Sequence, residues 1–190
     1  LIDEKLNQFD ELHKRYKEVA GIDYVLSKED LKKAAANYQE RGSEYSEYIE
    51  ECTENLGQAC KIIEKLNEFE SLCGDYTGIA KADYFLTKET LKSDAEKNSQ
   101  KPSEILKYIE NRLNDLKTAV EQERELSIQR KIDRKIEAYY FLWEEQNKPK
   151  DCISYDNLRR KCQSEGFYSK KSEEILDFYT AKLKAKLANG

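Results

Sequence analysis

The sequence repeats itself when it is shifted by sixty positions, and this repeat limits the possible folds more than any other feature. The match runs without a gap from residues 2–50 onto residues 62–110. Within it, the segment 23–32, DYVLSKEDLK, falls on the segment 83–92, DYFLTKETLK. An ungapped match of this length indicates duplication of one structural unit, so the chain is predicted to be a repeat protein.

A third and more diverged copy follows once a small shift in register is allowed. Its residues replace second-copy residues in this order: Ile136 for Phe69, Tyr139 for Leu72, Trp143 for Tyr76, Ile153 for Leu86 and Leu158 for Leu91. We therefore expect three tandem repeats of roughly sixty residues, at 1–60, 61–120 and 121–190.

Each copy is predicted to form three helices. The first has apolar residues at helical spacing, as in Leu6, Phe9, Leu12 and Tyr16. A hydroxyl that can cap free backbone N–H groups then opens the second helix, at Ser27, Thr87 or Ser154. Gly42 in the first copy and Pro102 in the second break the chain before the third helix.

Few breakers separate the third helix of one copy from the first helix of the next. Only Gly57 intervenes between residues 44 and 72, and residues 104–146 contain neither Gly nor Pro. We therefore expect two long helices shared between neighbouring copies, the second about 40 residues long. The predicted fold class is all-α, with three tandem helical repeats of roughly sixty residues in an elongated molecule.

Charge is distributed unevenly along the chain. The net charge of -5 divides into +4 for residues 130–190, from 14 basic and 10 acidic side chains, and -9 for the first 129 residues. A mostly acidic protein does not favour nucleic acid as a partner. No apolar run approaches the roughly 18 residues of a membrane span, so neither nucleic acid nor a membrane-spanning role is expected.

The connection inside each copy has a fixed spacing. Tyr16, Tyr76 and Trp143 each precede an aliphatic residue by ten positions, and a leucine follows five positions later. These aliphatic residues and leucines are Leu26 and Leu31, Leu86 and Leu91, and Ile153 and Leu158. The pattern resembles an EF-hand, specifically the fourteen-residue pseudo-EF-hand, over about thirty residues of each copy.

The resemblance implies a loop-closing ligand at Asp30, Thr90 and Asn157, and only Asp30 is a carboxylate. It also implies four backbone carbonyls as ligands in the first loop, those of Lys17, Ala20, Ile22 and Val25. Because Ca²⁺ takes six to eight oxygens, two interpretations stay open. Either the loops are metal-free corners and the chain has no cofactor, or the first loop holds one weak Ca²⁺ site.

The remaining candidate groups for chemistry are sparse. The five cysteines are an odd number, and Cys52 and Cys60 lie eight positions apart on one predicted helix, too far to form a disulfide. At least one thiol is therefore free within a monomer, which favours a cytoplasmic compartment, while a disulfide between copies stays open. The chain begins at Leu1 and has no Met, so the translated start is expected outside it and a mature secreted chain stays open.

His13 is the single histidine and is expected on a solvated helix face. Without catalytic motifs, no enzyme is predicted.

The run Tyr139-Tyr140-Phe141-Leu142-Trp143 places large side chains on all faces of a helix. Basic residues precede it by one or two turns. One interpretation is a partner-binding patch made of Arg130, Arg134, Tyr140, Phe141 and Trp143, since exposed aromatics with Arg anchor many interfaces. The other is that this run forms the densest part of the core.

The sequence thus predicts a non-enzymatic helical repeat protein that binds another protein, as a scaffold, adaptor or secreted effector. The alternative is a calcium-responsive sensor of EF-hand type, with its one site at Asp30. Neither the oligomeric state nor the identity of the protein partner follows from the residues.

Overall fold

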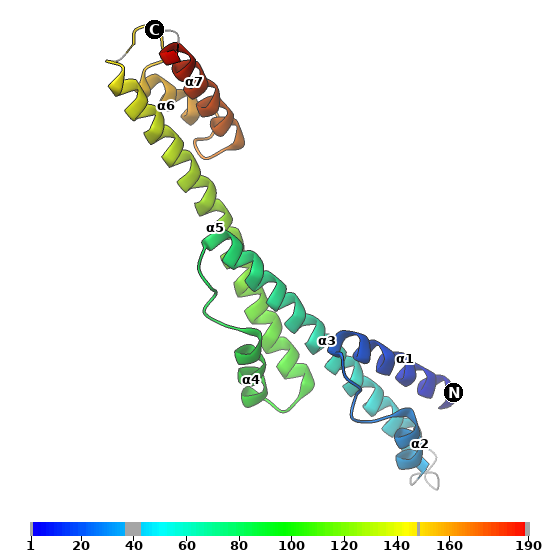
Figure 1. The fold of residues 1–190 in the computed structure, drawn as a ribbon. Helices are drawn as coiled ribbons and strands as arrows, with labels where there is room; N and C mark the ends of the chain where they lie inside the picture. Colours follow the sequence, from blue (N-terminus) through cyan, green and yellow to red (C-terminus); the bar gives the residue numbers. More distant parts are fainter. Residues whose placement is uncertain (1, 37–42, 148, 189–190) are drawn as a thin grey trace. The chain divides into compact units, whose positions relative to one another are not determined.

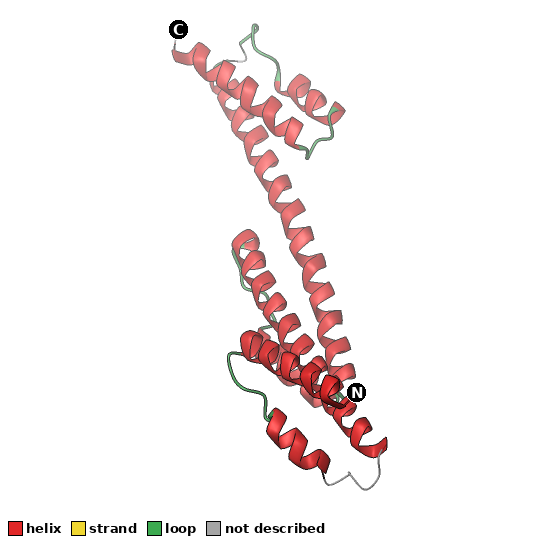
Figure 2. Ribbon diagram, turned by 90° about the vertical axis from the view of Figure 1, so that its right-hand side faces the viewer, coloured by secondary structure: helices red, strands yellow, loops and turns green. Residues whose placement is uncertain are grey.

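The computed structural model describes the chain except residues 1, 37–42, 148 and 189–190, and its described residues form helices and no strand (Figures 1 and 2). The prediction of an all-α fold is confirmed. In chain order the helices are α1 Ile2–Ala20, α2 Lys28–Ala36, α3 Ser43–Ala80, α4 Lys88–Asn98, α5 Pro102–Glu145, α6 Tyr155–Ser164 and α7 Lys170–Ala188.

The two long helices expected from the scarcity of Gly and Pro are α3, with 38 residues, and α5, with 44. Figure 1 follows each as one uninterrupted helix. Gly57 lies inside α3 and does not break it. Pro102 is the first residue of α5, where its missing N–H costs nothing, whereas Gly42 lies outside the described residues.

The three predicted hydroxyl caps are all present. In each case the hydroxyl accepts a bond from the backbone N–H three residues later: Asp30 to Ser27 at 3.2 Å, Thr90 to Thr87 at 3.3 Å and Asn157 to Ser154 at 3.3 Å. Thr90 also accepts a bond from the Thr87 N–H, which completes a capping box. These bonds satisfy N–H groups that a helix start leaves free and so fix where α2, α4 and α6 begin.

Three hydrophobic clusters form the cores. The first joins α1, α2 and α3, the second joins α3, α4 and α5, and the third joins α5, α6 and α7. Their buried residues are Leu6, Phe9, Leu31, Ile49, Leu56 and Cys60; then Leu66, Phe69, Leu91, Ala95, Ile109, Leu113, Leu116 and Val120; then Ile132, Ile136, Tyr139, Leu158, Cys162, Leu176 and Leu183. The helices α3 and α5 therefore each contribute to two clusters.

A helix that serves two clusters must bury two different faces. Leu56 packs in the first cluster and Phe69 in the second. At about 100° per residue, these two positions lie about 140° apart around α3. The apolar residues of α3 thus change sides along its length, and each half of the helix covers a different neighbour.

The chain divides into two compact units, Leu1–Val120 and Glu121–Gly190. The first unit holds the first two clusters, with α1, α2 and α4 packed along α3 and the first half of α5. The second unit holds the third cluster, in which α6 and α7 pack on the second half of α5.

Four helices are followed within two residues by a residue with a positive φ angle: Gly21 at 70°, Lys81 at 59°, Asn147 at 52° and Gly166 at 79°. Gly21 and Lys81 directly follow α1 and α3, and their N–H groups bond the carbonyls of Lys17 and Thr77 at 2.9 and 3.0 Å. This left-handed position ends many helices and suits glycine, because a Cβ there approaches the backbone closely.

We expect the Lys81→Gly substitution to stabilise the first unit by about 1 kcal/mol, since it removes that steric cost. The reverse change at the matching site, Gly21→Ala, should destabilise it by a similar amount. A Cβ at Gly21 would meet no atom within 4 Å, so only backbone strain contributes. Urea unfolding followed by circular dichroism measures both, and a destabilised Lys81→Gly variant would contradict the argument.

Candidate functional site

The outward face of α5 in the second unit carries most of the predicted partner-binding residues. At about 100° per residue, positions 130, 134 and 141 fall within about 40° of one another. All three side chains are exposed. The opposite face of the helix carries Ile132, Ile136 and Tyr139, which are buried in the third cluster. The structure therefore places Arg130, Arg134 and Phe141 on one solvent-facing stripe.

The two exposed aromatic side chains of this stretch contact each other. Phe141 is 55% exposed and Tyr140 37% exposed, and their ring centroids lie 5.8 Å apart with an edge-on geometry. Tyr140 also meets the ring of Tyr155, at the start of α6, edge-on at 5.0 Å. Because Tyr155 packs against the third cluster, it holds Tyr140 in place and leaves part of that ring open to solvent.

The other aromatics of the run belong to the core. Tyr139 is fully buried, and Trp143 is partly buried against the third cluster. The Tyr139 hydroxyl donates a 2.6 Å bond to the carbonyl of Ile153, and burial raises the pKa of this tyrosine to about 12. The run is therefore divided between the two predicted roles, an exposed patch and a part of the core. Tyr140 and Phe141 face solvent, whereas Tyr139 and Trp143 stabilise the unit.

A second group of residues, from α5, α6 and the connection between α6 and α7, was not singled out from the sequence. The Tyr168 hydroxyl donates to a carboxylate oxygen of Asp133 at 3.2 Å. The Phe167 ring stacks edge-on with Tyr168 at 5.0 Å, and the Arg159 guanidinium lies 5.9 Å from the Phe167 centroid. The sequence signal for this group was the spacing of Tyr155 and Arg159, which are four positions apart and so lie on the same face of α6. This group extends the arginine and aromatic surface along α6.

The two lysines near the candidate arginines have a different role. Lys131 and Lys135 bind the same oxygen of Glu173 on α7 at 2.6 and 2.7 Å, and Lys135 also binds Asp177 at 2.7 Å. Hydrogen bonds from Lys131 and Lys135 lower the pKa of Glu173 to about 2. These ion pairs join α5 to α7 and leave Arg130 and Arg134 on the open side of α5.

We expect the second unit to lose stability in acid through Glu173. Its pKa is lower in the folded chain than the ordinary 4.5, so the carboxylate stabilises the fold above that pH and the contribution is lost as pH falls from 4.5 to about 2. The Glu173→Gln variant should show a weaker pH dependence of unfolding over this range. Thermal unfolding at several acidic pH values measures this, with Glu174→Gln on the exposed neighbour as the control. Identical pH profiles for wild type and Glu173→Gln would contradict it.

The carboxylates in and next to the connection between α1 and α2 contact nearby residues of the chain. The Ser27 hydroxyl donates to Asp30 at 2.7 Å, and this bond lowers the pKa of Asp30. The carbonyl of Lys17, one of the implied calcium ligands, already accepts the N–H of Gly21. Asp23 forms an ion pair with Lys17 at 3.0 Å. The only loop carboxylate that the EF-hand resemblance offered to a metal is thus engaged in capping α2.

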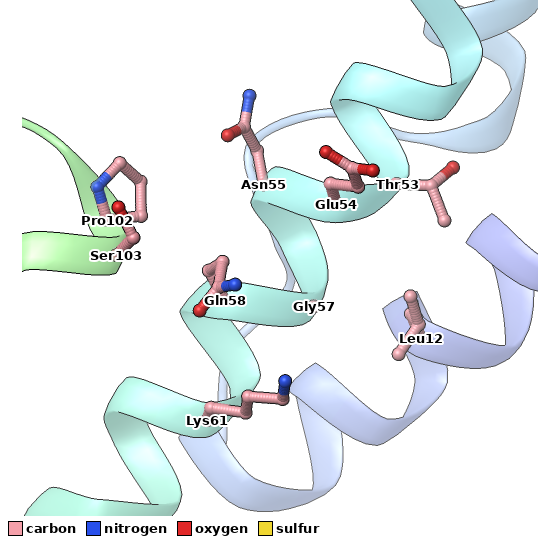
Figure 3. Close-up of a pocket in the computed structure, with 9 residues that line it drawn as sticks. All are labelled: Leu12, Thr53, Glu54, Asn55, Gly57, Gln58, Lys61, Pro102 and Ser103. Atoms are coloured by element: carbon pink, nitrogen blue, oxygen red, sulfur yellow. The ribbon is translucent and has the colours of Figure 1, made fainter. Parts of the chain in front are cut away.

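The first unit contains a cavity of about 650 Å³ that crosses α3 between α1 and the start of α5 (Figure 3). Gly57 leaves room at its centre, since a Cβ there would meet only the Leu12 side chain, at 3.8 Å. The lining residues are Leu12, Thr53, Glu54, Asn55, Gly57, Gln58, Lys61, Pro102 and Ser103. Glu54 is the one carboxylate of this described lining, which has no histidine or cysteine.

The cysteines and the histidine are mostly packing residues. All five cysteines are free thiols, and Cys60 and Cys162 are buried. His13 was expected to be solvated, and this was wrong. It is half-buried beside the Phe9 ring at 6.3 Å, and its Nε2 atom is shielded without a hydrogen-bond partner among the described residues. The partly buried face of α1 is thus wider than the charged residues around His13 indicate.

In the part of the chain that the structure describes, no group of three or more His, Cys, Asp or Glu side chains has the arrangement of a metal site. None of the described helices combines the length and apolar character needed to cross a membrane.

Comparison with known proteins gives no match to any family model, to any curated protein or to any solved structure.

Proposed function

We propose that this chain is a tandem array of three helical repeats that share α3 and α5, and that it acts as a non-enzymatic protein-protein interaction module. A scaffold, an adaptor or a secreted effector would each use such a module. The binding surface is the exposed part of the second unit around Arg130, Arg134, Tyr140 and Phe141, with Trp143 supporting it from the core.

Equivalent packing in the first two clusters supports the repeat. Buried residues sixty positions apart take corresponding places: Leu6 and Leu66, Phe9 and Phe69, Leu31 and Leu91, Ile49 and Ile109, and Leu56 and Leu116. A polar contact recurs as well. The amino group of Lys28 donates to Asn7 at 3.0 Å, and that of Lys88 donates to Asn67 at 2.8 Å.

The observation that carries the proposed function is the exposed Phe141 on the same stripe as Arg130 and Arg134. A phenylalanine that is 55% exposed leaves apolar surface in water, which costs free energy unless a partner covers it. Arginine and aromatic side chains supply most of the binding energy in protein interfaces. A protein partner explains both features of this stripe together.

The test is alanine substitution at Arg130, Arg134 and Tyr140 in one variant. Used as bait in affinity capture from the source cells, this variant should lose the partner that the wild-type chain retains, with a loss of binding of about tenfold or more. The matched control replaces Lys182, Lys184 and Phe178, which form an exposed basic and aromatic set on α7. The control should retain the partner. Equal capture by the wild type and the Arg130, Arg134 and Tyr140 variant would place the binding surface elsewhere.

Calcium sensing at Asp30 stays the alternative hypothesis. Its test is isothermal titration with millimolar Ca²⁺ against the wild type and the Asp30→Asn variant. Heat that only the wild type produces would support it, whereas no heat in either would dispose of it.

A further inference from the structure

One stretch of α5 has no buried residue. Residues 121–131 lie between Val120, the last buried residue of the second cluster, and Ile132, the first of the third. None of these eleven residues is buried, and the apolar Leu126 and Ile128 are 39% and 46% exposed. Within the stretch, Arg124 pairs with Glu121 at 3.6 Å and Arg130 with Glu123 at 3.4 Å, whereas Lys131 at its end pairs with Glu173 of α7 at 2.6 Å.

The other shared helix provides an internal comparison. In α3 the corresponding stretch between Cys60 and Leu66 is only residues 61–65, and Ile62 within it packs against the second cluster. Further along α3, Lys117 of α5 binds Glu68 at 2.7 Å. The helix α3 thus has buried residues along most of its length, whereas α5 has about three turns without a buried residue.

Helical stretches of this length are marginal in water without tertiary packing, because most helix stability in proteins comes from the buried face. Composition adds a smaller effect. Glu121 and Glu125 are like charges one turn apart, which weakens the helix, and Ser127 and Ile128 are moderate helix formers.

We propose that residues 121–131 of α5 open locally, as a break in the helix, while the clusters that precede and follow them in the chain stay folded. The segment is a conformational device built into the fold. It lets each unit fold, unfold and respond to a ligand without a rigid helical connection to the other. This inference does not depend on the proposed function.

Hydrogen exchange of the full-length chain, followed by mass spectrometry at residue resolution, tests it. Amides of residues 123–130 should exchange at least about tenfold faster than those of residues 61–65 of α3, since unpacked helix opens with a lower free energy than packed helix. Neither segment contains glycine or proline, so these residues do not account for a difference in exchange.

Two variants sharpen the test. The double change Leu126→Gly and Ser127→Gly should speed exchange within residues 121–131 by a further factor of about ten, from the lower helix propensity of glycine. The control Ser71→Gly lies at an exposed position of packed α3 and should leave exchange of its neighbours nearly unchanged. Equal protection of residues 123–130 and 61–65 would overturn the proposal. So would exchange of residues 133–143 at the same rate as 123–130, because opening would then be unfolding of the whole second unit.

Discussion

The Phe69→Ala variant should lose about 3–5 kcal/mol of unfolding free energy in the first unit. Phe69 is fully buried in the second cluster, and its ring lies 6.2 Å from that of Tyr84, edge-on. Alanine would leave a cavity where α3, α4 and α5 meet, because a helix that also packs in the first cluster cannot move to fill it. The loss combines the transfer free energy of the ring with the cost of that cavity.

The single tryptophan makes this prediction specific to one unit. Trp143 is the only Trp and lies in the second unit, so its fluorescence reports unfolding of that unit, while circular dichroism reports both. In urea, Phe69→Ala should shift the dichroism transition and leave the fluorescence transition in place. Phe85→Ala is the matched control, since this ring is 81% exposed and its loss should change stability by no more than about 0.5 kcal/mol. A joint shift of both signals would show that the units unfold together.

The Tyr139→Phe variant should destabilise the second unit by about 1–3 kcal/mol, although it removes a single oxygen. That oxygen donates the 2.6 Å bond to the Ile153 carbonyl, and Tyr139 has no exposed surface. Phenylalanine would leave the carbonyl without this donor in the connection between α5 and α6. The penalty comes from the lost hydrogen bond of a fully buried side chain, because the ring of phenylalanine offers no donor in its place.

Trp143 fluorescence in urea measures this loss directly. Here the fluorescence transition should shift while the dichroism of the first unit keeps its midpoint. Tyr168→Phe is the control, since its hydroxyl also bonds a protein oxygen but the side chain is 45% exposed and water can replace it. If the Tyr139→Phe and Tyr168→Phe variants had the same free energy of unfolding, the hydrogen bond to Ile153 would not stabilise the second unit.

The helices were predictable because their signals are local. Ser27, Thr87 and Ser154 cap helices by bonding the backbone N–H groups three residues later. The scarcity of Gly and Pro in α5 lets the helix continue from each turn to the next. The spacing of the buried residues was predictable too, since Phe69 and Leu91 follow Phe9 and Leu31 by sixty positions.

The candidate surface was only partly predictable because burial depends on what packs on each helix face. Within the aromatic run, Tyr139 and Phe141 differ by two positions, and periodicity alone could not decide which one α6 and α7 would cover. The contacts of Tyr168 with Asp133 and of Arg159 with Phe167 join segments far apart in the chain. The cavity beside Gly57 likewise requires the start of α5 to lie against α3.

The two faces of α3 have a consequence for how such a chain can change length. One residue inserted between Cys60 and Leu66 would rotate everything after it by about 100° and advance it by about 1.5 Å, so that Phe69 would leave its cluster. One residue inserted within 121–130 would leave the buried contacts of both units intact, because none of these residues is buried. Insertions and deletions should therefore be tolerated in this part of α5 and excluded from the centre of α3.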